Sequence, residues 1–224
     1  MDGILAVDKP QGMTSHDIVA FIRKHFGFKK VGHAGTLDPI ATGLLVILIG
    51  RYTRSSNLFI NDDKEYVATL VLGARSDTGD AWGKVIPSGK EIIFTNDRIE
   101  GTFKRFLGEI YQTPPAYSAI KYKGRKLYEL ARKNISVEIK PRKIHIKELE
   151  IMKLALPEIT FRVRCSKGTY VRQLCADIGD SLGCGGYMSG LRRTRSGKFS
   201  LDEALSMEEL KKIEAVALER KLVT

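Results

Sequence analysis

The chain has 224 residues, a formal net charge of +11 and a pI near 9.6. Hydrophobic residues make up 43% and charged residues 28%, which is typical of a globular protein with a real core. No segment approaches the ~20 apolar residues of a membrane span, and the N-terminus lacks a signal-peptide stretch. We therefore expect a cytoplasmic protein. The net positive charge predicts a polyanionic partner, because Lys and Arg that meet phosphates release condensed counterions.

The cysteines and histidines show no metal-binding pattern. The three cysteines form no C-x-x-C pair, and the four histidines lack metal-ligand spacing. Ser15-His16-Asp17 contains the residue types of a catalytic triad, but sequence neighbours do not face one another on a helix. We interpret this tripeptide as a helix start, and we expect neither a disulfide framework nor a zinc site.

The first predicted elements are a strand and an amphipathic helix. Gly3 to Val7 is apolar and is followed by turn residues, which indicates a short strand. Thr14 or Ser15 caps a helix that ends at Gly27. The apolar residues of this helix recur at helical spacing and are Ile18, Val19, Ile22 and Phe26.

The next segment places a carboxylate in a loop directly before a buried element. Asp-Pro and the flanking glycines of Gly32–Pro39 indicate a loop, and this loop contains Asp38. The apolar run Leu44–Ile49 that follows is rich in β-branched residues, which favours a buried strand. Rigid elements often present functional groups in this way. The alternative is a structural turn in which the carboxylate bonds to nearby backbone.

Further strands and helices alternate irregularly along the rest of the chain. The predicted strands are Glu65–Leu72, Lys143–Leu154 and Ile159–Cys165. The predicted helix starts are Asn96, Leu127, Thr169 and Ser206. The Asn96 helix carries apolar residues as far as Leu107, the Thr169 helix ends at Gly183, and Ser206 forms a capping box with Glu209. This order predicts a mixed α/β or α+β fold.

Basic and aromatic residues cluster in segments 117–128 and 162–198. The first contains Tyr117, Lys121, Tyr122, Lys123, Arg125, Lys126 and Tyr128. The second contains Arg162, Arg164, Lys167, Tyr170, Arg172, Arg192, Arg193, Arg195 and Lys198. Cations hold phosphates while aromatic faces stack on exposed bases, a combination used to recognise RNA loops. With the net charge, this favours RNA binding over the alternative, a solvated surface with core tyrosines.

Several motifs in order resemble those of the TruB-type tRNA pseudouridine synthases, relatives of the catalytic subunit of box H/ACA particles. The N-terminal motifs are Asp8-Lys9-Pro10-Gln11-Gly12-Met13-Thr14-Ser15, Gly32–Pro39, Lys64-Glu65-Tyr66 and Ser76-Asp77-Thr78-Gly79-Asp80. The later motifs are Pro114-Pro115-Ala116-Tyr117-Ser118-Ala119, Lys121-Tyr122-Lys123-Gly124, Ser166-Lys167-Gly168-Thr169-Tyr170-Val171-Arg172 and Gly183-Cys184-Gly185. Together they extend over roughly residues 3 to 200.

The resemblance implies a catalytic set of three residues. Asp38 matches the essential aspartate that initiates isomerisation of uridine to pseudouridine. Tyr66 matches the tyrosine that stacks on the target base and takes part in removing the C5 proton. Arg172 matches the arginine that pairs with the catalytic aspartate.

A substrate-binding set follows from the same resemblance. His33 matches a histidine that accommodates the everted nucleotide, and Asp80 matches a residue of the loop that contacts the RNA. Lys9, Lys167, Tyr170 and Leu191 are expected to line the site. The implied target is uridine 55 in the T loop of tRNA.

The implied chemistry suits these residue types. An Asp with pKa about 3.9 is ionised at neutral pH, and a paired Arg keeps it charged and fixes its direction. The target base must leave its stack, which costs a few kcal/mol, and a tyrosine face can return ~1–3 kcal/mol by stacking. Nothing in the scheme transfers electrons or activates water, so we expect no cofactor and no metal.

The family implies a central mixed, mostly antiparallel sheet flanked by helices. We expect residues 1–224 to form a single pseudouridine synthase catalytic domain, with no C-terminal RNA-binding domain of the PUA type. We also expect a monomer. Two alternatives remain open: a non-catalytic RNA-binding protein on the same fold, and a catalytic subunit that depends on guide RNA and partner proteins.

Overall fold

The structure is a computed structural model that describes residues 1–118, 120–133, 135 and 137–223. Ala119 of the Pro114 motif lies outside these residues, as do the side chains of Lys121 and Lys126 from the first basic segment. The chain divides into two compact units. Unit 1 is Met1–Val67 with Leu191–Thr224, and unit 2 is Ala68–Gly190.

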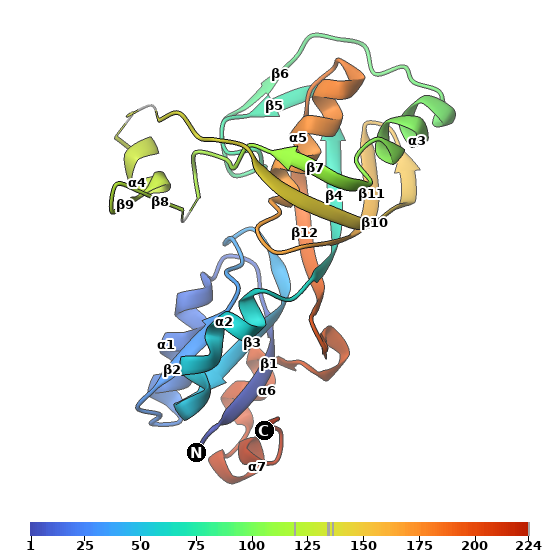
Figure 1. Ribbon diagram of the computed structural model, residues 1–224. Coiled ribbons are helices and arrows are strands. Elements are labelled where there is room, and N and C mark those ends of the chain that lie inside the picture. Colours follow the sequence, from blue (N-terminus) through green and yellow to red (C-terminus); the bar gives the residue numbers. More distant parts are fainter. Residues whose placement is uncertain (119, 134, 136, 224) are drawn as a thin grey trace. The chain divides into compact units, whose positions relative to one another are not determined.

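Unit 1 is built on three strands that pair through β3 (Figure 1). β1 (Gly3–Lys9) pairs antiparallel along β3 (Thr42–Ile49), and β2 (Val31–Ala34) pairs antiparallel with its second half. The first residues of β3 pair in parallel with β12 (Gly186–Ser196), which enters unit 1 from unit 2. The short strands β13 (Phe199–Ser200) and β14 (Leu205–Ser206) pair with β12 and β1.

The two faces of this sheet bury two apolar clusters because side chains alternate along each strand. One cluster joins Leu45, Ile47 and Ile49 to α1 (Ser15–His25), α6 (Met207–Lys212) and α7 (Ala215–Glu219). The other joins Leu44, Val46 and Leu48 to Phe199, with Tyr52 and Phe59 packed against it. The last two come from the 3-10 helix η1 (Gly50–Ser55) and from α2 (Ser56–Ile60). The predicted strand Leu44–Ile49 is therefore confirmed as a fully buried element.

The ends of α1 and α6 follow the predicted capping. Thr14 is the N-cap of α1 and forms a capping box with Asp17, and Gly27 follows the C-cap residue with φ +69°. Ser206 and Glu209 form the capping box of α6. The helix α7 and the 3-10 helix η2 (Leu201–Glu203) were not predicted.

Unit 2 contains the strand order β4-β11-β10-β7. The first of these strands, β4 (Lys64–Leu72), begins in unit 1. The others are β11 (Glu158–Cys165), β10 (Arg142–Ala155) and β7 (Gly108–Gln112). Strand β10 pairs antiparallel with both β11 and β7. Two small hairpins accompany them, β5 (Ala74–Ser76) with β6 (Val85–Pro87) and β8 (Lys121–Tyr122) with β9 (Arg125–Lys126). Most pairings of both units are antiparallel, so the predicted mixed fold is confirmed.

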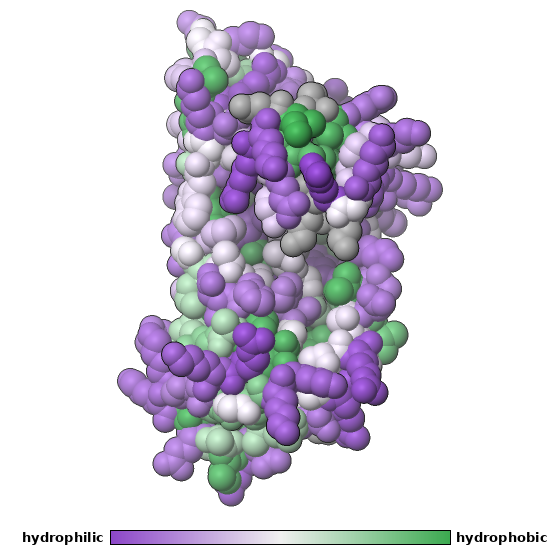
Figure 2. All heavy atoms as spheres, turned by 90° about the vertical axis from the view of Figure 1, so that its left-hand side faces the viewer, coloured by the Kyte–Doolittle hydropathy of each residue, from purple (hydrophilic) through white to green (hydrophobic). Residues whose placement is uncertain are grey.

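The helices of unit 2 are α3 (Asn96–Lys104), α4 (Leu127–Ala131) and α5 (Val171–Leu182). Helix α3 ends at Lys104, so Leu107 lies beyond it and the longer apolar face predicted there is wrong. Helix α5 has Tyr170 rather than Thr169 as its N-cap, and Gly183 ends it with φ +87° as predicted. The face drawn in Figure 2 carries mostly hydrophilic side chains. No helix of the described residues is long and apolar enough to cross a membrane.

Candidate active site

The register of unit 1 brings two cationic residues to the two sides of Gly43. Lys9 of β1 pairs with Gly43 of β3, and Arg193 of β12 pairs with the same glycine from the other side. Gly43 has φ +96°, and a Cβ there would lie 2.4 Å from the Arg193 carbonyl oxygen, so only glycine fits. The loop that carries Asp38 leads directly into this end of β3.

Hydrogen bonds to the backbone on both sides of Asp38 hold this residue in place. The Ser15 hydroxyl accepts from the Leu37 N–H at 2.9 Å and donates to the Leu37 carbonyl at 3.2 Å. The Gly12 N–H donates to the Pro39 carbonyl at 2.8 Å, and the Ala41 N–H donates to the Asp38 carbonyl at 3.0 Å. The backbone on both sides of Asp38 is therefore fixed, as a rigidly presented functional group requires.

Arg193 is the functional candidate that the sequence did not single out. It was only one member of the basic segment 162–198, yet its side chain is 1% exposed. Its Nε donates to the Leu44 carbonyl at 2.6 Å, and its Nη2 donates to the Gly35 carbonyl at 3.1 Å. Arg193 thus ties the start of the Asp38 loop to β3. No motif separated it from the exposed Arg192 and Arg195 beside it.

Lys9 is fully buried, and its charge interacts with that of Asp38. Its Nζ donates to the Met13 carbonyl at 2.7 Å and to the Pro10 carbonyl at 2.9 Å. Burial lowers the pKa of Lys9 to about 8, because it disfavours the charged form. The negative charge of Asp38 opposes this shift, and the positive charge of Arg193 adds to it. These three charged groups therefore interact within unit 1.

His33 lies on β2 and is half-buried. Its pKa is lowered, first by burial and then by the positive charge of Arg193, so the imidazole is neutral at pH 7. Among the described residues, its Nδ1 atom is buried and has no hydrogen-bond partner. A neutral ring with an unused nitrogen can donate to or accept from a ligand.

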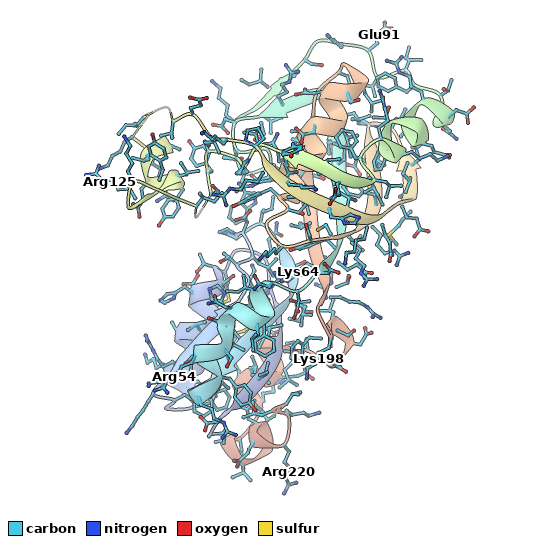
Figure 3. All side chains as sticks on the ribbon, in the orientation of Figure 1. Arg54, Lys64, Glu91, Arg125, Lys198 and Arg220 are labelled. Atoms are coloured by element: carbon cyan, nitrogen blue, oxygen red, sulfur yellow. The ribbon has the colours of Figure 1, made fainter. Side chains whose placement is uncertain are left out.

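Tyr66 and Leu191 are partly buried and pack against the apolar cluster that contains Leu37. Lys64, which precedes Tyr66 by two residues, is anchored at the end of α2 (Figure 3). Its Nζ donates to the Asp62 carbonyl at 2.6 Å and to the Ile60 carbonyl at 2.8 Å. The start of the strand that carries Tyr66 is therefore fixed in unit 1.

In unit 2, Arg172 forms a buried ion pair with Asp80. Its Nη1 lies 3.6 Å from Asp80 Oδ2, and the two side chains are 6% and 7% exposed. Arg172 also donates to the carbonyls of Thr78 and Tyr117. Asp80 Oδ1 accepts from the Thr78 hydroxyl at 2.8 Å and from the Trp82 N–H at 3.0 Å. The loop that carries Asp80 is thus bound to the start of α5.

Tyr170 and Lys167 precede Arg172 on the same segment. The side chain of Gln112 accepts from the Tyr170 N–H at 2.8 Å and donates to the Tyr170 carbonyl at 3.1 Å. The Arg172 guanidinium lies 5.9 Å from the centre of the Tyr170 ring. Lys167 is exposed. Gln112 is a second residue that sequence reasoning missed, because its role depends on a partner 58 positions away.

The sequence-predicted residues thus divide between the units. Unit 1 holds Asp38 near Lys9, with His33, Tyr66 and Leu191 in the same unit. Unit 2 holds Asp80, Arg172, Tyr170 and Lys167. The pairing of Arg172 with Asp38, which the resemblance implies, stays a prediction.

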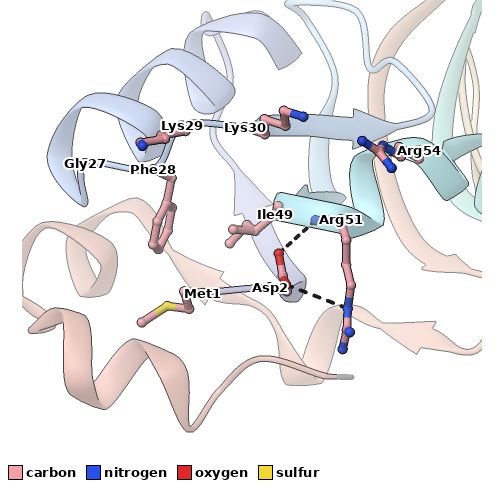
Figure 4. Close-up of a pocket in the computed structure, with 10 residues that line it drawn as sticks. Met1, Asp2, Gly27, Phe28, Lys29, Lys30, Ile49, Arg51 and Arg54 are labelled. Carbon is pink, nitrogen blue, oxygen red and sulfur yellow. Dashed lines mark hydrogen bonds and ion pairs between the residues drawn. The ribbon is translucent and has the colours of Figure 1, made fainter.

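A pocket elsewhere in unit 1 contains none of these residues (Figure 4). It lies at the far end of β3, and its lining is Met1, Asp2, Gly27, Phe28, Lys29, Lys30, Ile49, Gly50, Arg51 and Arg54. The Arg51 N–H donates to Asp2 at 2.8 Å, and its side chain pairs with the same carboxylate at 3.7 Å. Among the described residues, no three His, Cys, Asp or Glu side chains are grouped to hold a metal ion.

Family models match most of the sequence. The model of the TruB family pseudouridylate synthase N-terminal domain matches residues 23–171. The model of the tRNA pseudouridylate synthase B C-terminal domain matches residues 172–222.

Curated relatives and solved structures agree with these matches. The tRNA pseudouridine synthase B of Opitutus terrae is 45% identical over 100% of this chain and 92% of its own length. That of Alkaliphilus oremlandii is 49% identical over 96% of this chain and 72% of its own. A chain of a Cbf5-Nop10-Gar1 complex is 34% identical with a TM-score of 0.74, covering 94% of this chain. This chain spans 54% of that solved chain.

Proposed function

The chain belongs to the TruB family of pseudouridylate synthases and modifies uridine in tRNA, and we propose that its target is the T-loop uridine at position 55. The reaction breaks the N1–C1′ bond of the uridine, turns the base and rejoins it through C5. The observation that carries the proposal is the Asp38 loop, which is held by Ser15 and Gly12 near two buried cations.

In the proposed mechanism, Asp38 begins the reaction as a carboxylate. Lys9 favours this ionised form, because its positive charge interacts with that of the Asp38 carboxylate, and the buried Arg193 pairs with Gly43 on the other side of β3. Their side chains are tied to carbonyl oxygens, so their positive charges stay in place as the reaction proceeds. Such fixed charges need no reorganisation during the chemical step.

The target base is proposed to leave its stack and enter the site beside Tyr66. Stacking on an aromatic face is worth ~1–3 kcal/mol per base, which offsets part of the cost of flipping. Tyr66 also carries a hydroxyl group that can take part in removal of the C5 proton. The neutral His33 ring, with its buried Nδ1, supports a role in holding the everted nucleotide.

Arg172 is proposed to pair with Asp38 when the RNA is bound. A guanidinium has five N–H donors in a planar fork, so it can serve several acceptors at once. Its bonds to Thr78 and Tyr117 and its ion pair with Asp80 keep it directed while it does so. Asp80, Lys167 and Tyr170 are the accompanying RNA contacts of unit 2.

One experiment tests the target and the acid together. The purified protein is given a uridine-labelled tRNA transcript, and pseudouridine is measured in nuclease digests. A matched transcript carries cytidine at position 55, and Asp38→Asn and Asp38→Ala are tested beside the wild type. We expect product only from wild-type protein with uridine 55. Undiminished turnover by Asp38→Ala would exclude the mechanism, and product from the cytidine transcript would exclude the position.

The same experiment separates the two alternatives. RNA binding without product would indicate a binding protein, and product that requires added guide RNA and partner proteins would indicate a guided subunit.

We also propose that the protein acts as a monomer, which light scattering during size-exclusion chromatography tests directly. A dimer mass at assay concentration would contradict this.

A further inference from the structure

We propose that Ser15 is a positioning residue for Asp38, acting through both peptide groups of Leu37. Ser15 is 2% exposed and lies at the start of α1, 22 positions before Leu37. It does not touch the reacting atoms. The proposal rests on the proposed function, because it assigns Ser15 a task in the reaction that Asp38 begins.

The loop between β2 and β3 has few ladder hydrogen bonds of its own. Residues 35–41 fall outside both strands, so their buried N–H and C=O groups need other partners. A serine hydroxyl can donate one hydrogen bond and accept others at the same time. Ser15 uses both capacities on Leu37, accepting from its N–H and donating to its carbonyl.

The consequence for Asp38 follows from peptide geometry. The Leu37 carbonyl and the Asp38 N–H belong to one planar peptide group. Holding that carbonyl therefore sets the plane from which the Cα of Asp38 projects. The Leu37 side chain is 3% exposed in the apolar cluster, and the Gly12 bond to Pro39 holds the other side. Ser15 thus completes the fixation of the Asp38 backbone on its N-terminal side.

The expected effect of losing the hydroxyl is on turnover rather than on RNA binding. A misplacement of about 1 Å at a reacting group can cost about 100-fold in rate. We therefore expect Ser15→Ala to lower kcat about 10- to 100-fold. KM and the Kd for tRNA should change less than about threefold, because no RNA contact is removed.

Thr14→Ala is the matched control because Thr14 is the adjacent residue on the same helix. Its hydroxyl accepts from the Asp17 N–H and donates to the Asp17 carboxylate, and these bonds lie within the α1 cap. Removing it should lower the Tm as Ser15→Ala does, while kcat stays within about threefold of wild type. An equal fall of kcat in both variants would reduce Ser15 to a structural residue and overturn the proposal.

An isosteric pair keeps the test valid if the small variant folds poorly. Ser15→Thr and Ser15→Val have the same shape and differ only in the hydroxyl group. We expect the threonine variant to turn over at least about tenfold faster than the valine variant. Equal kcat in these two would overturn the proposal whatever the alanine variant does.

A readout without turnover separates this proposal from the proposed function. Hydrogen exchange of the Leu37 amide should be faster in Ser15→Ala than in Thr14→Ala, since only the first loses the acceptor of that N–H. Full turnover by Asp38→Asn would refute the proposed role of Asp38, and the Ser15 proposal with it. An inactive Asp38→Asn beside a fully active Ser15→Ala would refute the Ser15 proposal alone.

Discussion

In each unit, one side chain bonds to both the N–H and the carbonyl of a residue that lies shortly before a functional residue, and we call this arrangement a clamp. In unit 1, the Ser15 hydroxyl bonds to both the N–H and the carbonyl of Leu37, directly before Asp38. In unit 2, the Gln112 side chain bonds to both the N–H and the carbonyl of Tyr170, two residues before Arg172. Each clamp comes from a segment distant in sequence, so each depends on the fold being formed.

The electrostatics of the two regions differ. In unit 1, Lys9 and Arg193 are both buried cations that interact with one another and, in the case of Lys9, with Asp38. In unit 2, the buried Arg172 is paired with a buried acid, Asp80. Lys9 is thus influenced by charges of both signs, the acids Asp38 and Asp17 and the cation Arg193, whereas the unit 2 pair is neutralised by direct contact. The two units therefore position their functional residues by the same kind of hydrogen bonds, but the charges around those residues differ.

The largest effect that separates the regions is expected from Arg172→Met. Removing one partner of a buried ion pair leaves an uncompensated charge, which costs about 3–5 kcal/mol. We expect this loss in the free energy of unfolding by urea, followed by the fluorescence of Trp82. This is the single tryptophan of the chain and it lies in unit 2. Turnover should fall more than tRNA affinity, since the proposed partner of Arg172 is a carboxylate.

The double variant Arg172→Met/Asp80→Asn is the control for that prediction. It removes both charges, so it should be more stable than Arg172→Met alone. A double variant that loses the sum of the two single losses would mean that the pair is not internally neutralised. A loss confined to affinity, with a shallower salt dependence, would reassign Arg172 to phosphate contacts.

Local signals in the sequence were enough for most of the fold. The caps of α1 and α6, the buried strand β3 and the stop at Gly183 each depend on residues within one element. The apolar face predicted to Leu107 failed because α3 ends at Lys104, and helix ends are the least determined part of such patterns.

The candidate site was less predictable from sequence. Motif resemblance pointed to Asp38, but it gave no role to Arg193 or Gln112. Arg193 is buried because β12 pairs in parallel with β3, and the residues next to Arg193 in the sequence do not reveal this pairing. In the sequence it stands beside Arg192 and Arg195, which are exposed. Gln112 becomes visible only when β7 and the start of α5 are brought together.

The burial of the Lys9 amine in unit 1 is tested by the pH dependence of stability. Lys9 has a pKa of about 8 in the folded protein against 10.5 for an ordinary lysine. Between these values the unfolded chain binds a proton that the folded chain does not. The free energy of unfolding therefore rises with pH in this window. At 1.36 kcal/mol per unit, the total is roughly 3 kcal/mol, lost again as the pH falls towards 8.

The measurement compares the wild type with Lys9→Met between pH 8 and 10.5, using circular dichroism to follow urea unfolding. The stability of the wild type relative to the variant should increase across the window and level off below pH 8. Other titrating groups cancel in the difference. A difference that does not change with pH would mean that Lys9 stays charged in the folded protein, and that Asp38 outweighs its burial.

The smallest effect is expected from the clamp formed by Gln112 on Tyr170. Its loss tests whether this clamp, like that of Ser15, also affects turnover. Gln112 is 2% exposed, and Gln112→Met keeps its length but removes both bonds to Tyr170. Unpaired polar groups cost about 1–3 kcal/mol when buried, so we expect a loss of about 2 kcal/mol by Trp82 fluorescence. If Gln112→Met also lowers kcat about as far as Ser15→Ala, both clamps position reacting groups. An unchanged kcat would restrict that role to the clamp beside the acid, because Arg172 keeps its own bonds to Thr78 and Asp80.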